Sequence, residues 1–264
     1  MEVVPIVIAG LTVGVVFGLF GAGGSAFATP VLALLGVPPV LALASPLPAL
    51  LPASLAGARQ YHRSGLLDRH IALLAVLSGV PAVVAGAVIS KWLGGQLLLV
   101  LSGALLGVVG LRMAWPANQR RRVPTDASRG AGPGAAAPQA NTGPPRTGVV
   151  VAASAGVGLV TGLLANGGGF LLVPMFVLVL GLSSARAAGT SMVAVAALSL
   201  PTLAAHAALG HVDWAVAGAF AAGLVPASVV GARWGGRLPD PVARPAFGAM
   251  MVLFSAFFLI RLFT

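Results

Sequence analysis

The chain has 264 residues, of which 58% are hydrophobic and 8% charged, and it contains no cysteine. This balance excludes a soluble domain and is typical of an integral membrane protein. Without cysteine there are no disulfides, thiolate metal sites or cysteine nucleophiles. The net charge of +10 does not indicate a nucleic-acid partner, because the Lys and Arg residues lie in loops between apolar runs. Alternating strand patterns are absent, so we expect an all-α, polytopic helical membrane protein.

The uncharged runs of the first part of the chain predict five membrane segments. Residues 3–58 carry no charge, which is enough for three segments at about 20 residues per pass. Breaks are expected at Gly21–Gly24 and at Gly36–Pro39, because glycine and proline interrupt helices. Ile71–Ser90 and Trp92–Leu111 supply one further segment each.

A segment of different composition follows. Trp115–Arg146 is built from Pro, Gly, Ala and Arg with almost no large apolar side chain, which predicts a flexible linker. The expected organisation is therefore a first transmembrane repeat over 1–114, a cytoplasmic linker over 115–147 and a second transmembrane repeat over 148–264.

The second part again predicts five segments. Residues 147–185 carry no charge and hold two segments, divided at Asn166–Gly169. Three more are expected at Ala187–Ala205, Trp214–Ala232 and Pro245–Ile260.

The two parts also match in sequence, which predicts an internal repeat. The matches are ordered along the chain at an offset of 144 residues that slips to 145. At 144, Gly18, Leu19, Gly23, Gly24 and Pro30 meet Gly162, Leu163, Gly167, Gly168 and Pro174. At 145, Gly36, Gly65, Asp68, Pro81 and Gly86 meet Gly181, Gly210, Asp213, Pro226 and Gly231. Five segments is an odd number, so the second repeat should be inverted relative to the first.

The basic residues test this topology. With the linker in the cytoplasm, the loops that carry Arg59, Arg63 and Arg69, Arg186, and Arg233, Arg237 and Arg244 also lie inside, and both termini lie outside. Lys91 and Arg261 are the exceptions. Ala26–Gly36 is too short to span about 30 Å as a helix, which leaves a re-entrant half-helix open. The alternative topology has eight full passes, four in each repeat.

The two glycine clusters are the candidate binding site. Each precedes a new apolar helix, whose N-terminus offers free N–H groups and a partial positive charge, and glycine leaves room for an anion. Two broken segments at matching positions of two repeats are typical of a transporter's binding site. Helix packing is the alternative explanation for such glycines. The candidate substrate-binding residues are Gly21, Gly23, Gly24, Ser25, Asn166, Gly167, Gly168, Gly169, Thr190 and Ser191.

Other polar residues have simpler explanations. Asp68 and Asp213 occupy matching positions just before a helix and are expected to be N-caps. Pro46, Pro48 and Pro52 interrupt the segment that follows the first cluster, where Ser45 and Ser54 either line the site or bond the backbone. The four histidines, His62, His70, His206 and His211, lie near loop ends, where interfacial solvation explains them better than proton coupling.

The sequences GLFGAGGSAFATPVLALLGV and GLLANGGGFLLVPMFVLVLGLSSARAAGTS resemble the paired signature of the TauE/SafE family, the sulfite exporter-like permeases. The resemblance covers nearly the whole chain except the linker. It implies a multi-pass carrier in a prokaryotic plasma membrane for small sulfur-containing or related organic anions. It also implies substrate contacts at the two glycine clusters, Ser25, Asn166, Thr190 and Ser191.

The expected function is a secondary transporter of small anions such as sulfite or organosulfonates, working by alternating access. No catalytic constellation is present, so no enzyme activity, metal or cofactor is expected. The expected partners are the anion and the lipid bilayer, with a homodimer possible and the coupling ion, H⁺ or Na⁺, unassigned. A membrane scaffold whose glycines only pack helices is the alternative, and an anion channel is a third option.

Overall fold

The structure is a computed structural model that describes residues 3–114, 147–164 and 169–263. The predicted linker, apart from Thr147, lies outside the described residues. So do three candidate site residues of the second glycine cluster, Asn166, Gly167 and Gly168.

The described residues are all-helical. The first part contains α1 (Val3–Leu19), the 3₁₀ helix η1 (Gly21–Phe27), α2 (Ala28–Leu34), α3 (Pro39–Ala44), α4 (Leu47–Arg63), α5 (Arg69–Ser90) and α6 (Gly95–Ala114). The second part contains α7 (Thr147–Leu164), α8 (Gly169–Leu178), α9 (Ser184–Ala208), α10 (Trp214–Gly235) and α11 (Asp240–Phe263).

Helix length separates full spans from shorter segments. In the part of the chain that is described, seven helices are long and apolar enough to cross a membrane, counting α3 and α4 as one unit over Pro39–Arg63. Val3–Leu19, Gly21–Leu34 and the ten-residue α8 are shorter. The expected short segment after the first glycine cluster is confirmed, because α2 ends at Leu34 and Gly36 turns the chain with a φ of 85°.

The proline-containing segment of the first part and its counterpart in the second part differ. The predicted interruption is confirmed at Pro46, since α3 ends at Ala44 and α4 restarts at Leu47, but α4 continues through Pro52. The corresponding helix α9, by contrast, continues through Pro201 without a break. A proline inside a membrane helix is tolerated where neighbouring helices enclose the freed carbonyl.

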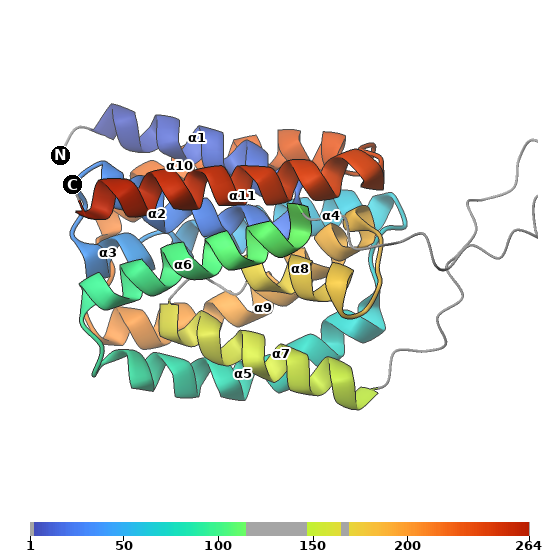
Figure 1. Cartoon of the computed structure of the whole chain (residues 1–264), viewed down its shortest axis with the longest axis horizontal. Helices are drawn as coiled ribbons and strands as arrows, with labels where there is room; N and C mark the ends of the chain where they lie inside the picture. Colours follow the sequence, from blue (N-terminus) through green and yellow to red (C-terminus); the bar gives the residue numbers. More distant parts are fainter. Residues whose placement is uncertain (1–2, 115–146, 165–168, 264) are drawn as a thin grey trace, which may run out of the picture.

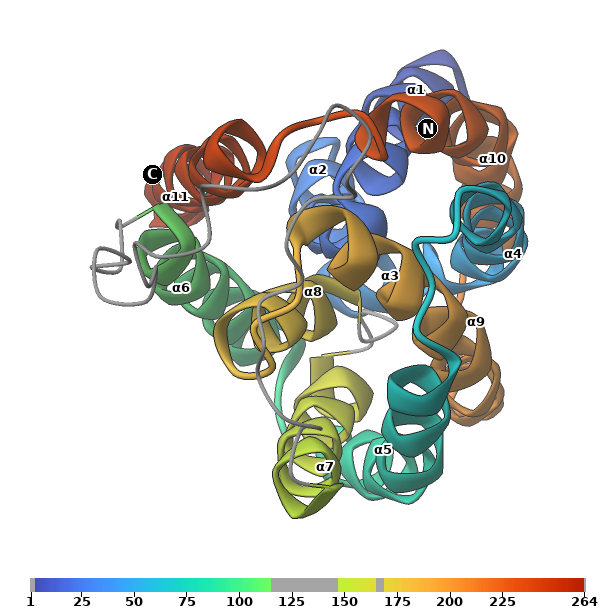
Figure 2. The same cartoon turned by 90° about the vertical axis from the view of Figure 1, so that its right-hand side faces the viewer.

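The long helices pack in pairs that join the two parts of the chain. Helix α1 packs along α10, α5 along α7, α6 along α11, and α4 against both α9 and α10. Viewed along the helices, these elements surround the short segments, with α2, α3 and α8 in the middle (Figure 2). The glycine segment η1, residues Gly21–Phe27, contacts α8 and α9 at this centre.

Glycines let the paired backbones touch. A Cβ atom at Gly18 of α1 would lie 2.6 Å from the Ala232 nitrogen of α10, and one at Gly162 of α7 would lie 2.8 Å from the Ala87 nitrogen of α5. Close approach through small residues is the usual way that membrane helices associate, because apolar side chains gain little by leaving lipid.

The loops divide between two ends of the bundle. The turns between α4 and α5, α8 and α9, and α10 and α11 lie at one end, and the N- and C-termini and the turn between α9 and α10 lie at the other (Figure 1). The first end, which we call the basic end, carries Arg63, Arg69, Arg186, Arg237 and Arg244. The expected clustering of the basic loops is therefore confirmed.

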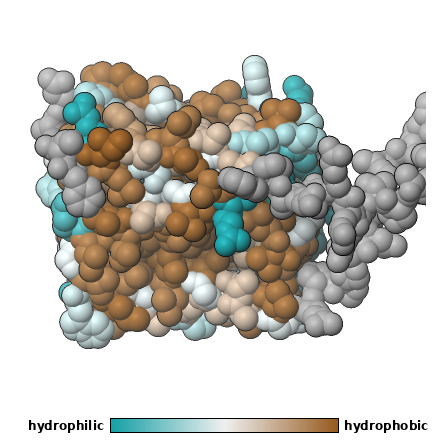
Figure 3. All heavy atoms as spheres, viewed as in Figure 1, coloured by the Kyte–Doolittle hydropathy of each residue, from teal (hydrophilic) through white to brown (hydrophobic). Residues whose placement is uncertain are grey.

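The surface between these ends is apolar. A broad hydrophobic face extends over the helices, and hydrophilic residues gather toward the two ends (Figure 3). Trp92, Trp214 and Trp234 are highly exposed at helix ends, as expected for side chains at the boundary between lipid and water.

Both predicted aspartate N-caps are confirmed. The Asp68 carboxylate accepts a hydrogen bond from the Ile71 N–H at 3.0 Å, at the start of α5. The Asp213 carboxylate accepts from the N–H groups of Ala215 and Val216 at the start of α10. Each carboxylate satisfies amide groups that the first helical turn leaves without a partner.

Candidate functional site

The glycine segment changes the course of the chain inside the bundle. Helix α1 ends at Leu19, and the chain continues as the tight 3₁₀ helix Gly21–Phe27 before α2 begins. All seven residues of this segment are buried. The predicted break at the first glycine cluster is confirmed, and the interrupted backbone lies inside protein, where such backbone is tolerated at membrane depth.

Two of its glycines are required by their surroundings. Gly21 has a φ of 72°, and a Cβ atom there would lie 2.7 Å from the Cβ atom of Ala188 in α9. A Cβ atom at Gly24 would overlap the backbone of Phe17, because η1 folds back against the end of α1. These glycines therefore let η1 pack closely against α1 and α9, so their helix-packing role is observed directly.

Hydroxyl groups surround the same backbone. The Ala22 N–H donates to the Ser191 hydroxyl at 3.3 Å, and that hydroxyl donates to the Ala188 carbonyl at 2.8 Å. The Ser25 hydroxyl donates to the Ala22 carbonyl at 2.8 Å. The structure thus brings together five candidate residues in all: Gly21, Gly23, Gly24, Ser25 and Ser191.

Thr190 has a different contact. Its hydroxyl accepts a hydrogen bond from the Asp68 N–H at 3.0 Å, at the start of α5. The Ser45 hydroxyl does the same for the Asp213 N–H at 3.0 Å, at the start of α10. Ser45 and Thr190 lie 145 residues apart, as do Asp68 and Asp213, so the matched positions carry matched contacts. Gly169, the last candidate of the second cluster, begins α8.

Sequence reasoning missed Tyr61 and wrongly treated His206 as a solvated histidine, whereas these two side chains hold the ends of α1 and α7. The Tyr61 hydroxyl donates to the carbonyls of Gly18 and Leu19 at the end of α1. The His206 Nε2 lies 3.0 Å from the Gly162 carbonyl near the end of α7. The signal that could have found the pair is their spacing, because Tyr61 and His206 are 145 residues apart.

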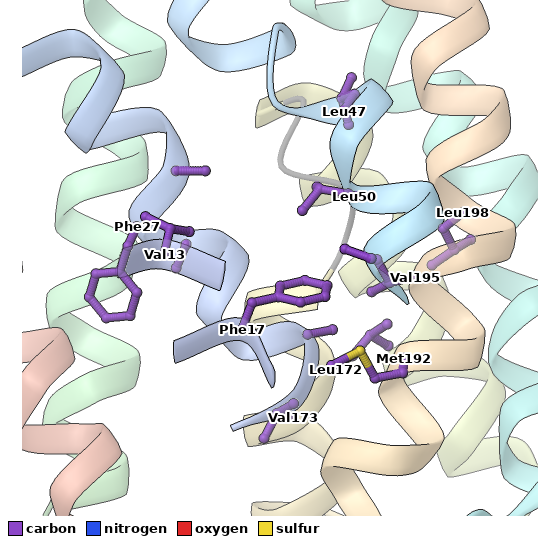
Figure 4. Packing of buried hydrophobic residues seen from close by; sticks show 14 of the residues in the cluster. Val13, Phe17, Phe27, Leu47, Leu50, Leu172, Val173, Met192, Val195 and Leu198 are labelled. Carbon is purple, nitrogen blue, oxygen red and sulfur yellow. The ribbon is translucent and has the colours of Figure 1, made fainter. Parts of the chain in front are cut away.

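Apolar side chains fill the space beside the glycine segment. Phe17 points from α1 toward Leu50 of α4 and Val195 of α9, with Leu172 of α8 close by (Figure 4). Phe17 and Val195 have no exposed surface, and Leu50 is also fully buried. This packing closes the centre of the bundle in the present conformation.

A small pocket of about 10 Å³ lies near the basic end, next to the end of α1 at Leu19 and Phe20. Phe20, Ser184, Arg244 and Phe247 are among the residues that line it. A Cβ atom at Gly23 would lie 2.6 Å from the Phe247 ring, so the pocket is adjacent to the glycine segment. The volume is near the minimum for one water molecule. Arg244 gives its wall a positive charge that would attract an anion.

Replacing Tyr61 with phenylalanine is expected to destabilise the protein by about 1–3 kcal/mol, because the buried carbonyls of Gly18 and Leu19 lose their donor. Thermal unfolding of the purified protein in detergent measures the change. Ser64→Ala is the matched control, since it removes an exposed hydroxyl bonded to the Gln60 carbonyl of the same helix. Equal melting temperatures for Tyr61→Phe and the control would contradict the structural role.

With this geometry described, comparison with known proteins identifies the family. Residues 6–258 match the family model for "Sulfite exporter TauE/SafE". The chain belongs to the TauE/SafE family. It is therefore a multi-pass membrane transporter and not an enzyme.

Curated relatives of this TauE/SafE protein carry the same general description. A "Probable membrane transporter protein" of Xylella fastidiosa (strain 9a5c) is 30% identical over 213 residues, covering 80% of this chain and 76% of the relative. The "Probable membrane transporter protein YunE" of Bacillus subtilis (strain 168) is 27% identical over 259 residues, covering 92% and 89%. No solved structure matches this chain.

Proposed function

We propose that this protein is a secondary transporter that moves small anions, such as sulfite and organosulfonates, across the plasma membrane by alternating access. The observation that carries the proposal is the buried glycine segment, where a membrane helix is interrupted and the backbone N–H of Ala22 meets the Ser191 hydroxyl. In the present conformation the Ala22 N–H and the Ser191 hydroxyl bond within the protein, and a bound anion would take over these donors without a lysine or arginine among them.

Matched contacts support an inverted repeat for the two halves. Gly18 of α1 lies against Ser228 and Ala232 of α10, while Gly162 of α7 lies against Val83 and Ala87 of α5. These positions correspond at offsets of 144 and 145 residues. The hydrogen-bonded pairs Ser45–Asp213 and Thr190–Asp68 are also related by the offset of 145 residues. Each half would thus contribute one helix to each of the two pairs, α1–α10 and α5–α7, as expected of halves that rock against each other.

The two ends of the bundle support a direction for access. The pocket lies beside the glycine segment on the side of the basic end, which the positive-inside rule assigns to the cytoplasm. Phe17, Leu50 and Val195 fill the centre beside the segment (Figure 4). Alternating access then requires these side chains to separate as the pocket at the basic end closes.

The test is binding of a sulfonate to the purified protein, followed by its transport in proteoliposomes. Ethanesulfonate and sulfite are expected to raise the melting temperature of the native protein, and Ser191→Ala is expected to weaken sulfonate binding about tenfold, equivalent to one lost hydrogen bond of about 1.4 kcal/mol. Ser255→Ala is the matched control, because it also removes a buried hydroxyl bonded to a backbone carbonyl, that of Gly103, in a different helix pair.

Substitutions of the glycines themselves are poor probes of binding. A side chain at Gly24 would overlap the backbone of Phe17, so a loss of function there would report misfolding. Ser191→Ala adds no volume, and its structural cost is limited to the Ala22 N–H, which loses its partner.

The alternatives give different results. No thermal shift with any oxyanion, together with no flux, would favour a membrane scaffold and overturn the transporter proposal. Flux that does not saturate with sulfonate concentration would favour an anion channel over a carrier.

A further inference from the structure

His206 is unusual among the described side chains because it is titratable and buried. Only 3% of its surface is exposed, although the sequence placed it with the solvated histidines near loop ends. Tyr61 is buried at the matching position, but a phenol keeps its proton across the physiological range. Among the described core residues, His206 is therefore the side chain that can change its charge between pH 5 and 8.

The contacts of His206 define where its protons lie. Its Nε2 atom is 3.0 Å from the Gly162 carbonyl, and its Nδ1 atom is 3.1 Å from the Nδ1 atom of His211. A carbonyl oxygen only accepts, so the His206 Nε2 carries hydrogen and donates to Gly162. In the neutral ring the Nδ1 atom is then an acceptor, and the His211 Nδ1–H donates to it.

This chain of hydrogen bonds has room for one further proton. In the neutral pair, the Nε2 atom of His211 has a free lone pair that can take a proton from water while both existing bonds remain. A second proton would place hydrogens on both Nδ1 atoms, which are 3.1 Å apart, and would break the pair. The geometry therefore sets a stoichiometry of one proton.

His211 connects the pair to the solvent. It lies in the turn between α9 and α10 and is partly exposed, at the end of the bundle opposite the basic loops. Burial lowers the pKa of His211, so the pair is neutral at pH 7 unless a negative charge is nearby.

The elements around the pair offer no built-in counter-charge among the described residues. Helices α3, α7 and α8 carry no ionisable side chain, and α5 carries Arg69 and His70 only at its far end, with Lys91 after its last turn. The ionisable groups of α4 lie at its C-terminal end, which is also the basic end. Asp213, two residues after His211, has its carboxylate bonded to the N–H groups of α10.

We propose that the His206–His211 pair is the proton-binding site of this transporter and is loaded together with the anion. The inference rests on the proposed function, because the anion supplies the negative charge that the protonated pair lacks among its described neighbours. The link between the two sites is α7, since His206 holds Gly162 near the end of that helix and α8 begins after it at Gly169. The proton and the anion then raise each other's affinity by the same factor.

The matched position in the first repeat gives the site a direction. Tyr61 holds the end of α1 at the basic end with a hydroxyl that does not titrate, whereas His206 holds the end of α7 with an imidazole that is hydrogen-bonded to the proton-accepting His211. Protons are therefore expected to bind from the side of the membrane that carries the turn between α9 and α10. The coupling ion that the sequence left unassigned is then H⁺.

The first experiment measures the accumulation of ethanesulfonate in proteoliposomes that contain the protein. The charge of ethanesulfonate is constant between pH 5 and 8. An acidic pH on the face that carries His211 should drive accumulation by the native protein. His206→Gln should lower this accumulation at least tenfold but keep exchange of ethanesulfonate at equal pH, because the glutamine amide still donates to Gly162. His70→Gln is the control, since His70 is exposed at the basic end and outside the pair. Accumulation by His206→Gln equal to that of the native protein would overturn the proposal.

The second experiment separates this proposal from the proposed function. Native protein that does not exchange ethanesulfonate at equal pH refutes the transport proposal itself. Nitrogen-15 spectra of labelled histidine then test the pair directly in the purified protein. One shared protonation step, whose midpoint at His211 shifts in His206→Gln, supports the pair. Independent titration of His206 and His211 refutes it whatever transport shows.

Discussion

Replacing Gly162 with valine is expected to prevent the protein from folding stably. A Cβ atom at this position would overlap the Val83 carbonyl and lie 2.8 Å from the Ala87 nitrogen, and both are backbone atoms of α5 that cannot rotate away. Separating α7 from α5 would also pull the Gly162 carbonyl away from His206. The expected cost is about 3 kcal/mol or more, at the upper end for overpacking. Size-exclusion profiles and melting temperatures in detergent measure the effect.

The same helix provides the control. Gly156 of α7 is exposed, and a Cβ atom there has no neighbouring atom within 4 Å. Gly156→Val is therefore expected to fold and melt like the native protein. If both valine variants behave alike, the close packing of α7 against α5 is wrong.

Replacing Gly21 with alanine is expected to give the second-largest loss. The φ of 72° costs an L-residue about 1–2 kcal/mol, and the added Cβ atom meets the backbone of Ala188 as well. Since Ala188 also accepts from Ser191, the collision would displace the hydroxyl that bonds Ala22. We expect a lower melting temperature and loss of the shift induced by ethanesulfonate.

Gly36→Ala separates the two causes. Gly36 has a φ of 85°, but a Cβ atom there would have open space around it. Only the conformational cost of about 1–2 kcal/mol applies, so this variant should keep its response to ethanesulfonate. An equal loss of that response in both variants would mean that backbone strain, and not contact with α9, explains Gly21.

Much of the architecture was predictable because it depends on local composition. The charge-free runs located the long helices, and the glycine cluster at Gly21–Gly24 located the end of α1. The spacing of Asp68 and Asp213 before apolar runs located two N-caps. Each of these features depends on residues close together in the chain. Hydropathy determines the long helices, glycine the end of α1 and an aspartate side chain each N-cap.

The candidate site was predictable only in part. Glycine clustering found the buried segment, and the resemblance pointed to Ser191, which contacts it. Thr190, its neighbour, instead bonds the start of α5, because adjacent residues of a helix point in directions about 100° apart. Which of two neighbouring hydroxyls faces the segment depends on how α9 is rotated, and that rotation is set by packing.

The sequence by itself determined that this chain is a helical membrane protein, where its helices are interrupted, and to which family it is similar. Only the tertiary structure decided that α1 pairs with α10 and α7 with α5, and that His206 is buried against Gly162 and His211. The reason is that helix formation in a membrane depends on local hydropathy and internal hydrogen bonds. Partner choice and burial depend on backbone contacts between residues far apart in the chain, such as Gly162 and Val83.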